Sequence, residues 1–188
     1  YFHFRGPELD GRTLGLVGLG AIGRLVADRA RGFGMAVVAF DPFVDAAPPG
    51  VELVALDELL VRSDVVSIHC PLTPETRGLI GERELGLMRP EAILVNTARA
   101  AVVDEQALLH ALRQRDIAGA ALDVFWEEPL APDHPILALD NVTITPHVAG
   151  AADDVQRHHA RMIIDDVARW QAGEPLQHAV VPPQGARA

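Results

Sequence analysis

Short apolar runs alternate along this chain with stretches in which apolar residues recur every three or four positions. The runs have the length of strands and are bounded by Gly, Pro, Asn or Asp. They predict six strands, over residues 13–17, 36–40, 65–69, 92–95, 117–122 and 142–145. Because strands that alternate with helices form a parallel sheet covered on both faces, the pattern predicts an α/β fold, a doubly wound parallel sheet of the Rossmann type.

The helical spacing between those runs predicts the elements that cover the sheet. It indicates helices over residues 22–30, 53–60, 105–112 and 151–170, with shorter helical turns over 79–88. Asp104 stands where an N-cap would begin the third of these helices. Gly173 and Pro175 follow the last helix and are typical stop signals.

The first predicted strand leads into three glycines with the spacing G-x-G-x-x-G, namely Gly18, Gly20 and Gly23. In a strand–turn–helix unit the first glycine permits the bend, the second lets a pyrophosphate approach, and the third lets helix and strand pack closely. The helix N-terminus that follows favours an anion. The second strand ends at Asp41, where a carboxylate would hydrogen-bond the hydroxyls of an adenosine ribose. This order favours a dinucleotide site over a plain glycine-rich turn with a loop aspartate.

Composition narrows the classes of partner. The chain has 188 residues and a formal net charge of −10, which argues against a nucleic-acid surface because such a surface needs clustered Lys and Arg. No apolar run reaches the length of about 18 residues that a membrane span needs. With Cys70 as the single cysteine, no internal disulfide or thiolate metal cluster can form, and no histidine spacing resembles a zinc site. We therefore expect no nucleic acid, membrane or metal partner, and a reducing, cytoplasmic location.

Three polar residues at the ends of predicted strands are candidates for chemistry. Ligands of parallel sheets bind at the carboxyl ends of the strands, so Arg99, Glu128 and His147 are expected to face one crevice with the glycine turn. The guanidinium fork of an arginine binds both oxygens of a carboxylate. A histidine can give or take the proton of a hydroxyl near neutral pH, and a nearby carboxylate fixes its tautomer. With a nicotinamide, these groups suffice to interconvert a 2-hydroxy acid and a 2-oxo acid.

Each candidate also has a plainer interpretation. An arginine after a strand is commonly a surface charge, and Glu127 and Glu128 could be a solvated pair. His69 also ends a predicted strand, so the pattern alone does not separate it from His147. Cys70 has no activating partner in the sequence, and we expect an inert small residue rather than a nucleophile.

Five runs of sequence, taken in order, resemble a known family. They are GLVGLGAIG, HCPLTPETRGLI, MRPEAILVNTARAAVVDEQAL, GAALDVFWEEPL and ITPHVAG. The chain resembles the NAD-binding domain of the D-isomer-specific 2-hydroxyacid dehydrogenases over about residues 11–150. The order and spacing of these runs are far more specific than the glycine motif alone.

The resemblance implies a role for each candidate residue. Arg99 would hold the substrate carboxylate, His147 would be the acid/base, and Glu128 would pair with His147, which favours His147 over His69. The implied cofactor is NAD, with Asp41 at the adenosine ribose. The residues expected to contact the cofactor are Gly18, Gly20, Ala21, Ile22, Gly23, Asp41, Cys70, Thr76, Thr97, Ala98, Arg99, Asp123, His147, Ala149 and Gly150.

The implied activity is hydride transfer between a D-2-hydroxy acid or 2-oxo acid and nicotinamide, as in glyoxylate/hydroxypyruvate or phosphoglycerate dehydrogenases. The alternative is an NAD(H)-sensing regulatory or co-repressor-like module without significant catalysis. The intact set of Arg99, Glu128 and His147 favours the enzyme, because a sensor does not need all three. The resemblance also implies a homodimer formed through this domain, and Asp41 should repel the 2′-phosphate of NADP.

The resemblance further divides the chain into parts. Residues 1–10 are expected to be a linker from an absent domain, with a frayed terminus as the alternative, and residues 11–150 the NAD-binding domain. Residues 151–181 would be a crossover helix and a remnant of the substrate domain, followed by a loose tail over 182–188. Two departures from the family pattern are Ala100, where Gly or Pro is usual, and Ala21, where an arginine is common.

Overall fold

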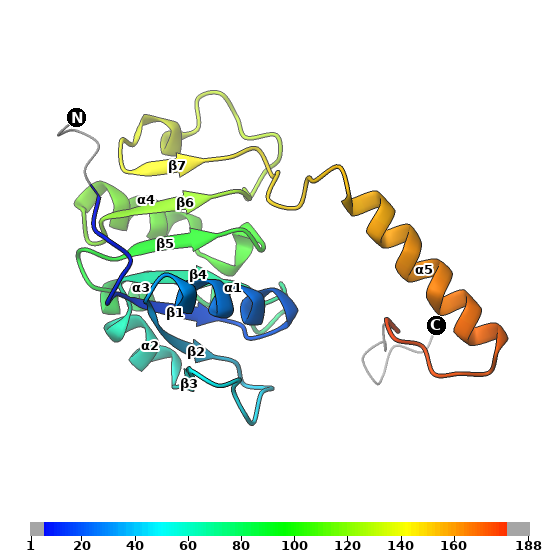
Figure 1. The fold of residues 1–188 in the computed structure, drawn as a ribbon. Helices are drawn as coiled ribbons and strands as arrows, with labels where there is room; N and C mark the ends of the chain where they lie inside the picture. The colour runs from blue at the N-terminus through cyan, green and yellow to red at the C-terminus, as the bar shows by residue number, and fades with distance from the viewer. Residues whose placement is uncertain (1–5, 180–188) are drawn as a thin grey trace. The chain divides into compact units, whose positions relative to one another are not determined.

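The computed structural model describes residues 6–179 and confirms the predicted α/β fold (Figure 1). The described residues divide into two compact units, one that ends at Ala149 and one that begins at Gly150. The first unit holds a seven-stranded sheet in the order β3-β2-β1-β4-β5-β6-β7. Every neighbouring pair in this sheet is parallel. The expectations for residues 1–5, for the last two residues of the segment 151–181 and for the tail 182–188 lie outside the described residues.

The elements follow one another in the βα alternation that the pattern predicts. The strands are β1 (Thr13–Val17), β2 (Ala36–Phe40), β3 (Val51–Leu53), β4 (Val65–Ile68), β5 (Ile93–Asn96), β6 (Gly119–Leu122) and β7 (Val142–Ile144). The helices are α1 (Ala21–Gly32), α2 (Leu56–Arg62), α3 (Glu82–Leu87), α4 (Glu105–Gln114) and α5 (Val155–Gln171). Two 3₁₀ turns, η2 (Ala100–Val102) and η3 (Pro135–Ala138), lie in the loops. As expected, Asp104 caps α4, where its side chain accepts a hydrogen bond from the N–H of Ala107.

Several element boundaries differ from the sequence prediction by a few residues, and for two helix starts the structure gives the reason. The predicted helix over 53–60 is wrong at its start, because Leu53 belongs to β3, which the pattern does not predict. Three residues are too few to show a period of two, and pairing with β2 decides the conformation. The last helix begins at Val155 rather than at residue 151, because the preceding residues form a turn in which the N–H of Val155 donates to the carbonyl of Ala152.

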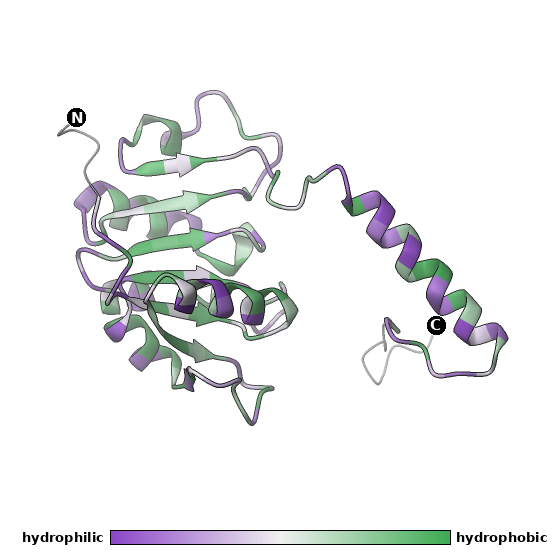
Figure 2. Ribbon diagram, in the orientation of Figure 1, coloured by the Kyte–Doolittle hydropathy of each residue, from purple (hydrophilic) through white to green (hydrophobic). Residues whose placement is uncertain are grey.

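The core of the first unit lies on both faces of the sheet. Successive side chains of a strand point to opposite faces. Thus Leu16 of β1 packs with α1 in one apolar cluster, whereas its neighbour Val17 packs in a second cluster with α2, α3 and α4. Figure 2 shows the strands as the most hydrophobic part of this unit. A fully buried leucine such as Leu94 contributes about 1.5–3 kcal/mol, so the sheet holds its strand ends in fixed positions.

The second unit consists of α5 and the segment that follows it. The carboxylate of Asp166 accepts hydrogen bonds from the N–H groups of Gln177 and His178, so this segment folds back along the helix. Between them lies an apolar cavity of about 530 Å³, lined in part by Met162 and Trp170. None of the helices within residues 6–179 combines the length and the apolar character of a transmembrane segment.

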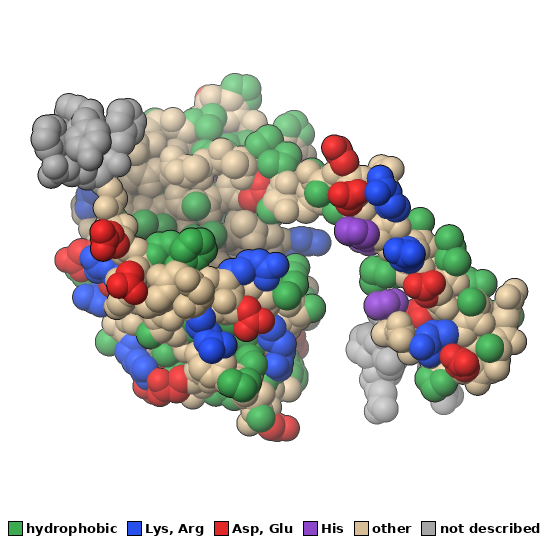
Figure 3. All heavy atoms as spheres, in the orientation of Figure 1, with side chains coloured by type: hydrophobic (Ala, Val, Ile, Leu, Met, Phe, Trp, Pro, Cys, Tyr) green, Lys and Arg blue, Asp and Glu red, His purple; other side chains and the backbone are tan. Residues whose placement is uncertain are grey.

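The surface carries charges of both signs. On the face of the first unit shown in Figure 3, Arg side chains are interspersed with Asp and Glu, and the sequence contains no lysine. Charges on the surface also form ion pairs, such as Arg62 with Glu52 and Arg83 with Asp57. A nucleic-acid surface needs cations gathered on one face, whereas the cations on this face are mixed with anions.

Candidate active site

The site lies at the carboxyl ends of the strands. Because all strands run parallel, the segments that leave β1, β5, β6 and β7 begin at the same edge of the sheet. The strand order reverses between β1 and β4, since β2 and β3 lie on one side of β1 and the later strands on the other. Such a switch point is where doubly wound sheets bind their ligands. The topology therefore brings the glycine turn and the three catalytic candidates to one edge.

The glycine turn has one position with room for a ligand. Gly18 has a φ of +102°, and a Cβ there would lie 2.6 Å from the backbone nitrogen of Cys70. A Cβ on Gly23 would lie 2.4 Å from the carbonyl oxygen of Gly18, so both glycines are needed for packing within the protein. A Cβ on Gly20 would meet nothing within 4 Å. Gly20 is also the N-cap of α1 and supplies no capping side chain. This turn thus fits a pyrophosphate beside Gly20.

Asp41 is anchored beside the glycine turn. Its carboxylate accepts hydrogen bonds from the N–H of Leu19 at 2.8 Å and from the N–H of Phe43 at 3.0 Å. Burial raises the pKa of the nearby Cys70 thiol, and the negative charge of Asp41 adds to this effect. Cys70 is therefore held as a neutral thiol, which fits its interpretation as an inert residue. The Thr76 hydroxyl donates to the Pro71 carbonyl at 2.6 Å and so stabilises the loop between these two residues.

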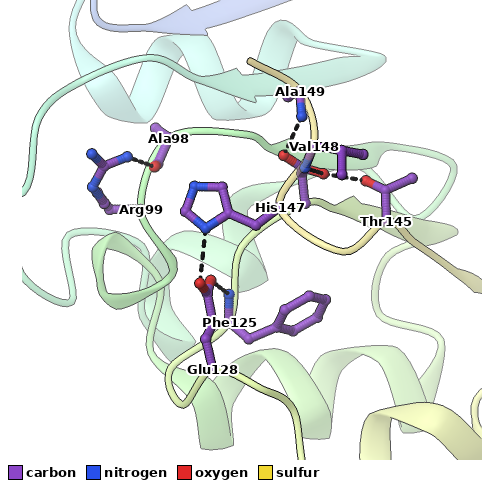
Figure 4. A network of polar contacts seen from close by, with 9 residues as sticks. Ala98, Arg99, Phe125, Glu128, Thr145, His147, Val148 and Ala149 are labelled. Carbon is purple, nitrogen blue, oxygen red and sulfur yellow. Dashed lines mark hydrogen bonds and ion pairs between the residues drawn. The ribbon is translucent and has the colours of Figure 1, made fainter. Parts of the chain in front are cut away.

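Glu128 and His147 form a hydrogen-bonded pair (Figure 4). The Nδ1 atom of His147 lies 2.8 Å from Oε2 of Glu128, and the other carboxylate oxygen accepts from the N–H of Phe125 at 3.0 Å. The bond with His147, and then the one from Phe125, lowers the pKa of Glu128. Since an ionised carboxylate only accepts hydrogen bonds, Nδ1 carries the proton and Nε2 is left for a substrate. The pair thus has the arrangement of a general acid/base with its orienting carboxylate.

Asp123 fixes the loop that carries His147. Its buried carboxylate accepts hydrogen bonds from the N–H groups of Val148 and Ala149, both at 2.8 Å, and from the Thr145 hydroxyl. Burial opposes the ionised form, but these three hydrogen bonds hold the pKa of Asp123 below its usual range. His147 has a φ of +54°, a conformation that costs a non-glycine residue roughly 1–2 kcal/mol. The contacts of Asp123 on either side of His147 maintain that conformation.

The Arg99 loop is held by another buried side chain. Asn96 accepts a hydrogen bond from the N–H of Ala98 at 3.0 Å and donates to the carbonyl of Arg99 at 3.1 Å. Arg99 is exposed, and its guanidinium donates to the Ala98 carbonyl at 2.6 Å. Its positive charge also lowers the pKa of Glu128, and Figure 4 shows Arg99 beside the pair of Glu128 and His147. Ala100 is buried as the first residue of η2, so this loop forms without the usual Gly or Pro.

Some sequence candidates lie apart from this group. His69 pairs with Ser67, whose hydroxyl lies 3.0 Å from Nε2, and burial lowers the pKa of His69. It therefore lacks the carboxylate partner that His147 has. Thr97 is exposed, and Gly150 begins the second unit, so their contacts with a cofactor stay predictions. Among residues 6–179, no three His, Cys, Asp or Glu side chains are grouped to hold a metal ion.

Sequence reasoning did not single out three residues that shape the site. They are Asn96, Thr145 and Trp126, and each makes a hydrogen bond at a strand end or to a neighbouring loop. Their signal in the sequence is a polar or amphipathic side chain next to an apolar strand. Such a signal is too common to identify them without their partners.

Comparison with known proteins identifies the family. The model for the NAD-binding domain of the D-isomer specific 2-hydroxyacid dehydrogenases matches residues 1–149. The chain belongs to this family. It is 44% identical over 180 residues to the D-3-phosphoglycerate dehydrogenase of Archaeoglobus fulgidus, which is 94% of this chain and 34% of that protein. It is 47% identical over 172 residues to the glyoxylate reductase of Korarchaeum cryptofilum, which is 90% of this chain and 52% of that protein.

Solved structures of the family share the fold. A D-isomer specific 2-hydroxyacid dehydrogenase from Xanthobacter autotrophicus Py2, in complex with NADPH and MES, superposes with a TM-score of 0.87 at 38% identity. The match covers 97% of this chain and 76% of that one. The present chain spans about a third to a half of the length of the two curated relatives. The described domain is thus an NAD-binding domain of this family.

Proposed function

We propose that the protein is an NAD-dependent oxidoreductase that interconverts a D-2-hydroxy acid and the corresponding 2-oxo acid. The observation that carries this proposal is the 2.8 Å contact between Glu128 and His147 at the edge of the sheet that also bears the glycine turn and Arg99. This set combines an acid/base, its orienting carboxylate and a cation for a carboxylate substrate.

The residues present fit the dinucleotide. The N–H groups of Ala21 and Ile22 at the start of α1 would hold the pyrophosphate, and Asp41 would hold the adenosine ribose. Cys70 and Thr76 would line the adenosine side. Those on the nicotinamide side would be Thr97, Ala98, Asp123, His147, Ala149 and Gly150. When bound, the nicotinamide exchanges a hydride with C2 of the substrate.

The side chains of His147, Glu128 and Arg99 transfer the proton and bind the substrate. Nε2 of His147 takes the proton of the substrate hydroxyl when the alcohol is oxidised, and returns it when the 2-oxo acid is reduced. Glu128 keeps Nδ1 protonated and stabilises the imidazolium. Arg99 binds the substrate carboxylate through its guanidinium fork and supplies the local cation that a chain of net charge −10 needs.

Further features of the whole protein follow from the family resemblance. We propose NAD as the preferred cofactor because the carboxylate of Asp41 would repel a 2′-phosphate. We also propose a homodimer formed through this domain and a cytoplasmic location, the latter supported by the single cysteine. Residues 151–181 would lead from this domain toward a substrate domain. Light scattering and cell fractionation of the full-length protein test the dimer and the location.

A substrate panel with a catalytic variant tests the activity. The full-length protein should oxidise NADH in the presence of at least one small 2-oxo acid, and His147→Ala should lower kcat at least about 100-fold. The variant should bind NADH as tightly as the wild type, because His147 acts on the substrate. If no 2-oxo acid of a broad panel supports oxidation while NADH still binds, the proposal is wrong and the NAD(H)-sensing alternative is favoured.

A further inference from the structure

A hydrogen bond of Trp126 connects the loop that carries Arg99 to the loop that carries Glu128. Its indole Nε1–H donates to the backbone carbonyl of Val103 at 2.9 Å. Val103 follows η2 and lies four positions after Arg99, whereas Trp126 lies two positions before Glu128. One hydrogen bond therefore joins the segment that bears the substrate-binding cation to the segment that bears the orienting carboxylate.

The surroundings of this hydrogen bond make it rigid. Val103 is 1% exposed, and its own N–H donates to the carbonyl of Ala100 within the same turn. The indole ring of Trp126 is partly buried and packs against the main apolar cluster. A buried carbonyl that loses its donor is costly, so the segment after Arg99 and the indole are held in one relative position.

The hydrogen bond between Trp126 and Val103 also restrains the position of the Glu128 carboxylate, which is two residues away from Trp126. Residues 125–128 form a turn that closes where the N–H of Phe125 donates to the Glu128 carboxylate. Trp126 lies inside this turn, so a shift of its backbone moves the carboxylate that His147 contacts. One other side-chain hydrogen bond or ion pair joins the same two regions within residues 6–179, the ion pair of His134 with Glu105 at 2.9 Å. That pair lies at the far ends of both segments, six positions beyond Arg99 and Glu128.

We propose that Trp126 is a positioning residue that sets the placement of Arg99 relative to the pair of Glu128 and His147. This inference rests on the proposed function, since it concerns the same reaction. Trp126 does not contact the reacting atoms. It acts through two loops that must hold the carboxylate and the hydroxyl of one small substrate at the same time. A misplacement of about 1 Å can cost an enzyme roughly 100-fold in rate.

The test separates the indole N–H from the bulk of the ring. Replacement of Trp126 by 3-benzothienylalanine keeps the ring shape and removes the donor, and Trp126→Phe is the simpler variant. In the full-length protein, both should lower kcat/KM for the 2-oxo acid about 10–100-fold, with a higher KM and a lower kcat, while the Kd for NADH stays within twofold. Trp170→Phe on α5, where the tryptophan is 72% exposed, is the matched control and should leave kcat/KM unchanged.

A second readout does not depend on turnover. The ¹⁵N chemical shifts of the neutral His147 imidazole report which ring nitrogen carries the proton. Glu128→Gln should convert the Nδ1–H form into a mixture of tautomers, and loss of the Trp126 donor should shift the population part of the way toward that mixture. If the wild type turns over no substrate, the proposed function fails, and this population still decides the role of Trp126.

Two results would overturn the inference. One is a kcat/KM within twofold of the wild type for the benzothienylalanine variant. The other is a tautomer population in that variant that equals the wild type, with or without a lowered Tm, which would make Trp126 a residue of the core and nothing more.

Discussion

The carboxylate of Asp123 accepts a hydrogen bond from the backbone N–H of Ala149 at 2.8 Å, so a buried acid at the end of β6 fixes the loop that follows β7. This contact spans 26 positions of the sequence and lies two residues beyond His147. The sheet fixes the strand ends, and the hydrogen bonds of Asp123 fix the loop with His147 relative to them. Its proposed place beside the nicotinamide and its role in this loop are compatible, because a carboxylate can accept more than three hydrogen bonds.

The first prediction concerns the hydroxyl that donates to Asp123. Thr145→Val removes this donor, keeps the shape, and should lower the free energy of unfolding by roughly 1–3 kcal/mol, because a buried carboxylate loses a partner. The same variant of the full-length protein should lose activity, since His147 is then less well held. Urea unfolding and steady-state kinetics measure both effects. Thr145→Ser retains the hydroxyl and should restore most of each. If Thr145→Val matches the wild type in both, Asp123 does not need this donor.

The second prediction separates ligand binding from packing in the glycine turn. Gly20→Ala should leave Tm nearly unchanged, because a Cβ there meets nothing within 4 Å, but it should weaken NADH binding at least about tenfold. Gly23→Ala should instead lower Tm, because its Cβ would lie 2.4 Å from the Gly18 carbonyl oxygen. Thermal unfolding and fluorescence titration with NADH distinguish the two. Equal NADH affinity for Gly20→Ala and the wild type would place the pyrophosphate elsewhere.

The third prediction concerns the choice between NAD and NADP. Asp41→Asn removes the negative charge beside the predicted ribose site and should raise the ratio of NADP to NAD affinity about tenfold or more. Asp45→Asn, an exposed acid four positions further on, is the matched control and should leave the ratio as it is. Titration of each protein with both cofactors gives the ratio. Tighter binding of NADP than NAD by the wild type would contradict the proposed preference, and a relative of this chain has been solved with NADPH.

The fourth prediction is a pH dependence of stability that arises at Asp64. Its carboxylate accepts a hydrogen bond from the N–H of Thr13 at 2.8 Å and contacts Arg12 and Arg89. Burial opposes ionisation, but these partners hold the pKa of Asp64 below its usual value of 3.8. The carboxylate therefore stabilises the fold above the unfolded-state pKa, and this contribution is lost as the pH falls through the lower folded-state pKa.

The variant Asp64→Asn tests that assignment. It should lower the free energy of unfolding at pH 7 by roughly 1–3 kcal/mol and make its decline below about pH 4 shallower. Urea unfolding between pH 3 and pH 7 is the measurement. Asp140→Asn, which removes an exposed partner of Arg115, is the control and should change stability by less than about 1 kcal/mol. Parallel pH curves for wild type and Asp64→Asn would show that other acids dominate.

Local sequence was sufficient for the elements whose signal lies within the element itself. The apolar run of β1, the helical spacing of α1 and the cap at Asp104 depend on neighbours a few positions away, so their types could be predicted. β3 could not be predicted, because three residues carry too little pattern and pairing with β2 decides their conformation.

The residues of the site could be predicted only in part from the local sequence. The residue pattern left His69 and His147 undecided, and the family resemblance favoured His147. The structure places the carboxylate of Glu128 against His147 and leaves His69 with Ser67. The positions of Asn96, Trp126 and Thr145 at loop contacts carry no distinctive pattern, and their partners lie at other positions along the folded chain.

The sequence by itself therefore determined the α/β alternation, the glycine turn and the types of side chain available at the strand ends, because these follow from the conformational preferences and spacing of nearby residues. Only the tertiary structure decided which of those side chains meet. The contacts between Glu128 and His147, between Asp123 and Ala149, and between Trp126 and Val103 join residues 19, 26 and 23 positions apart. Such contacts form because the parallel sheet brings distant strand ends to one edge, and no local pattern specifies which side chains meet there.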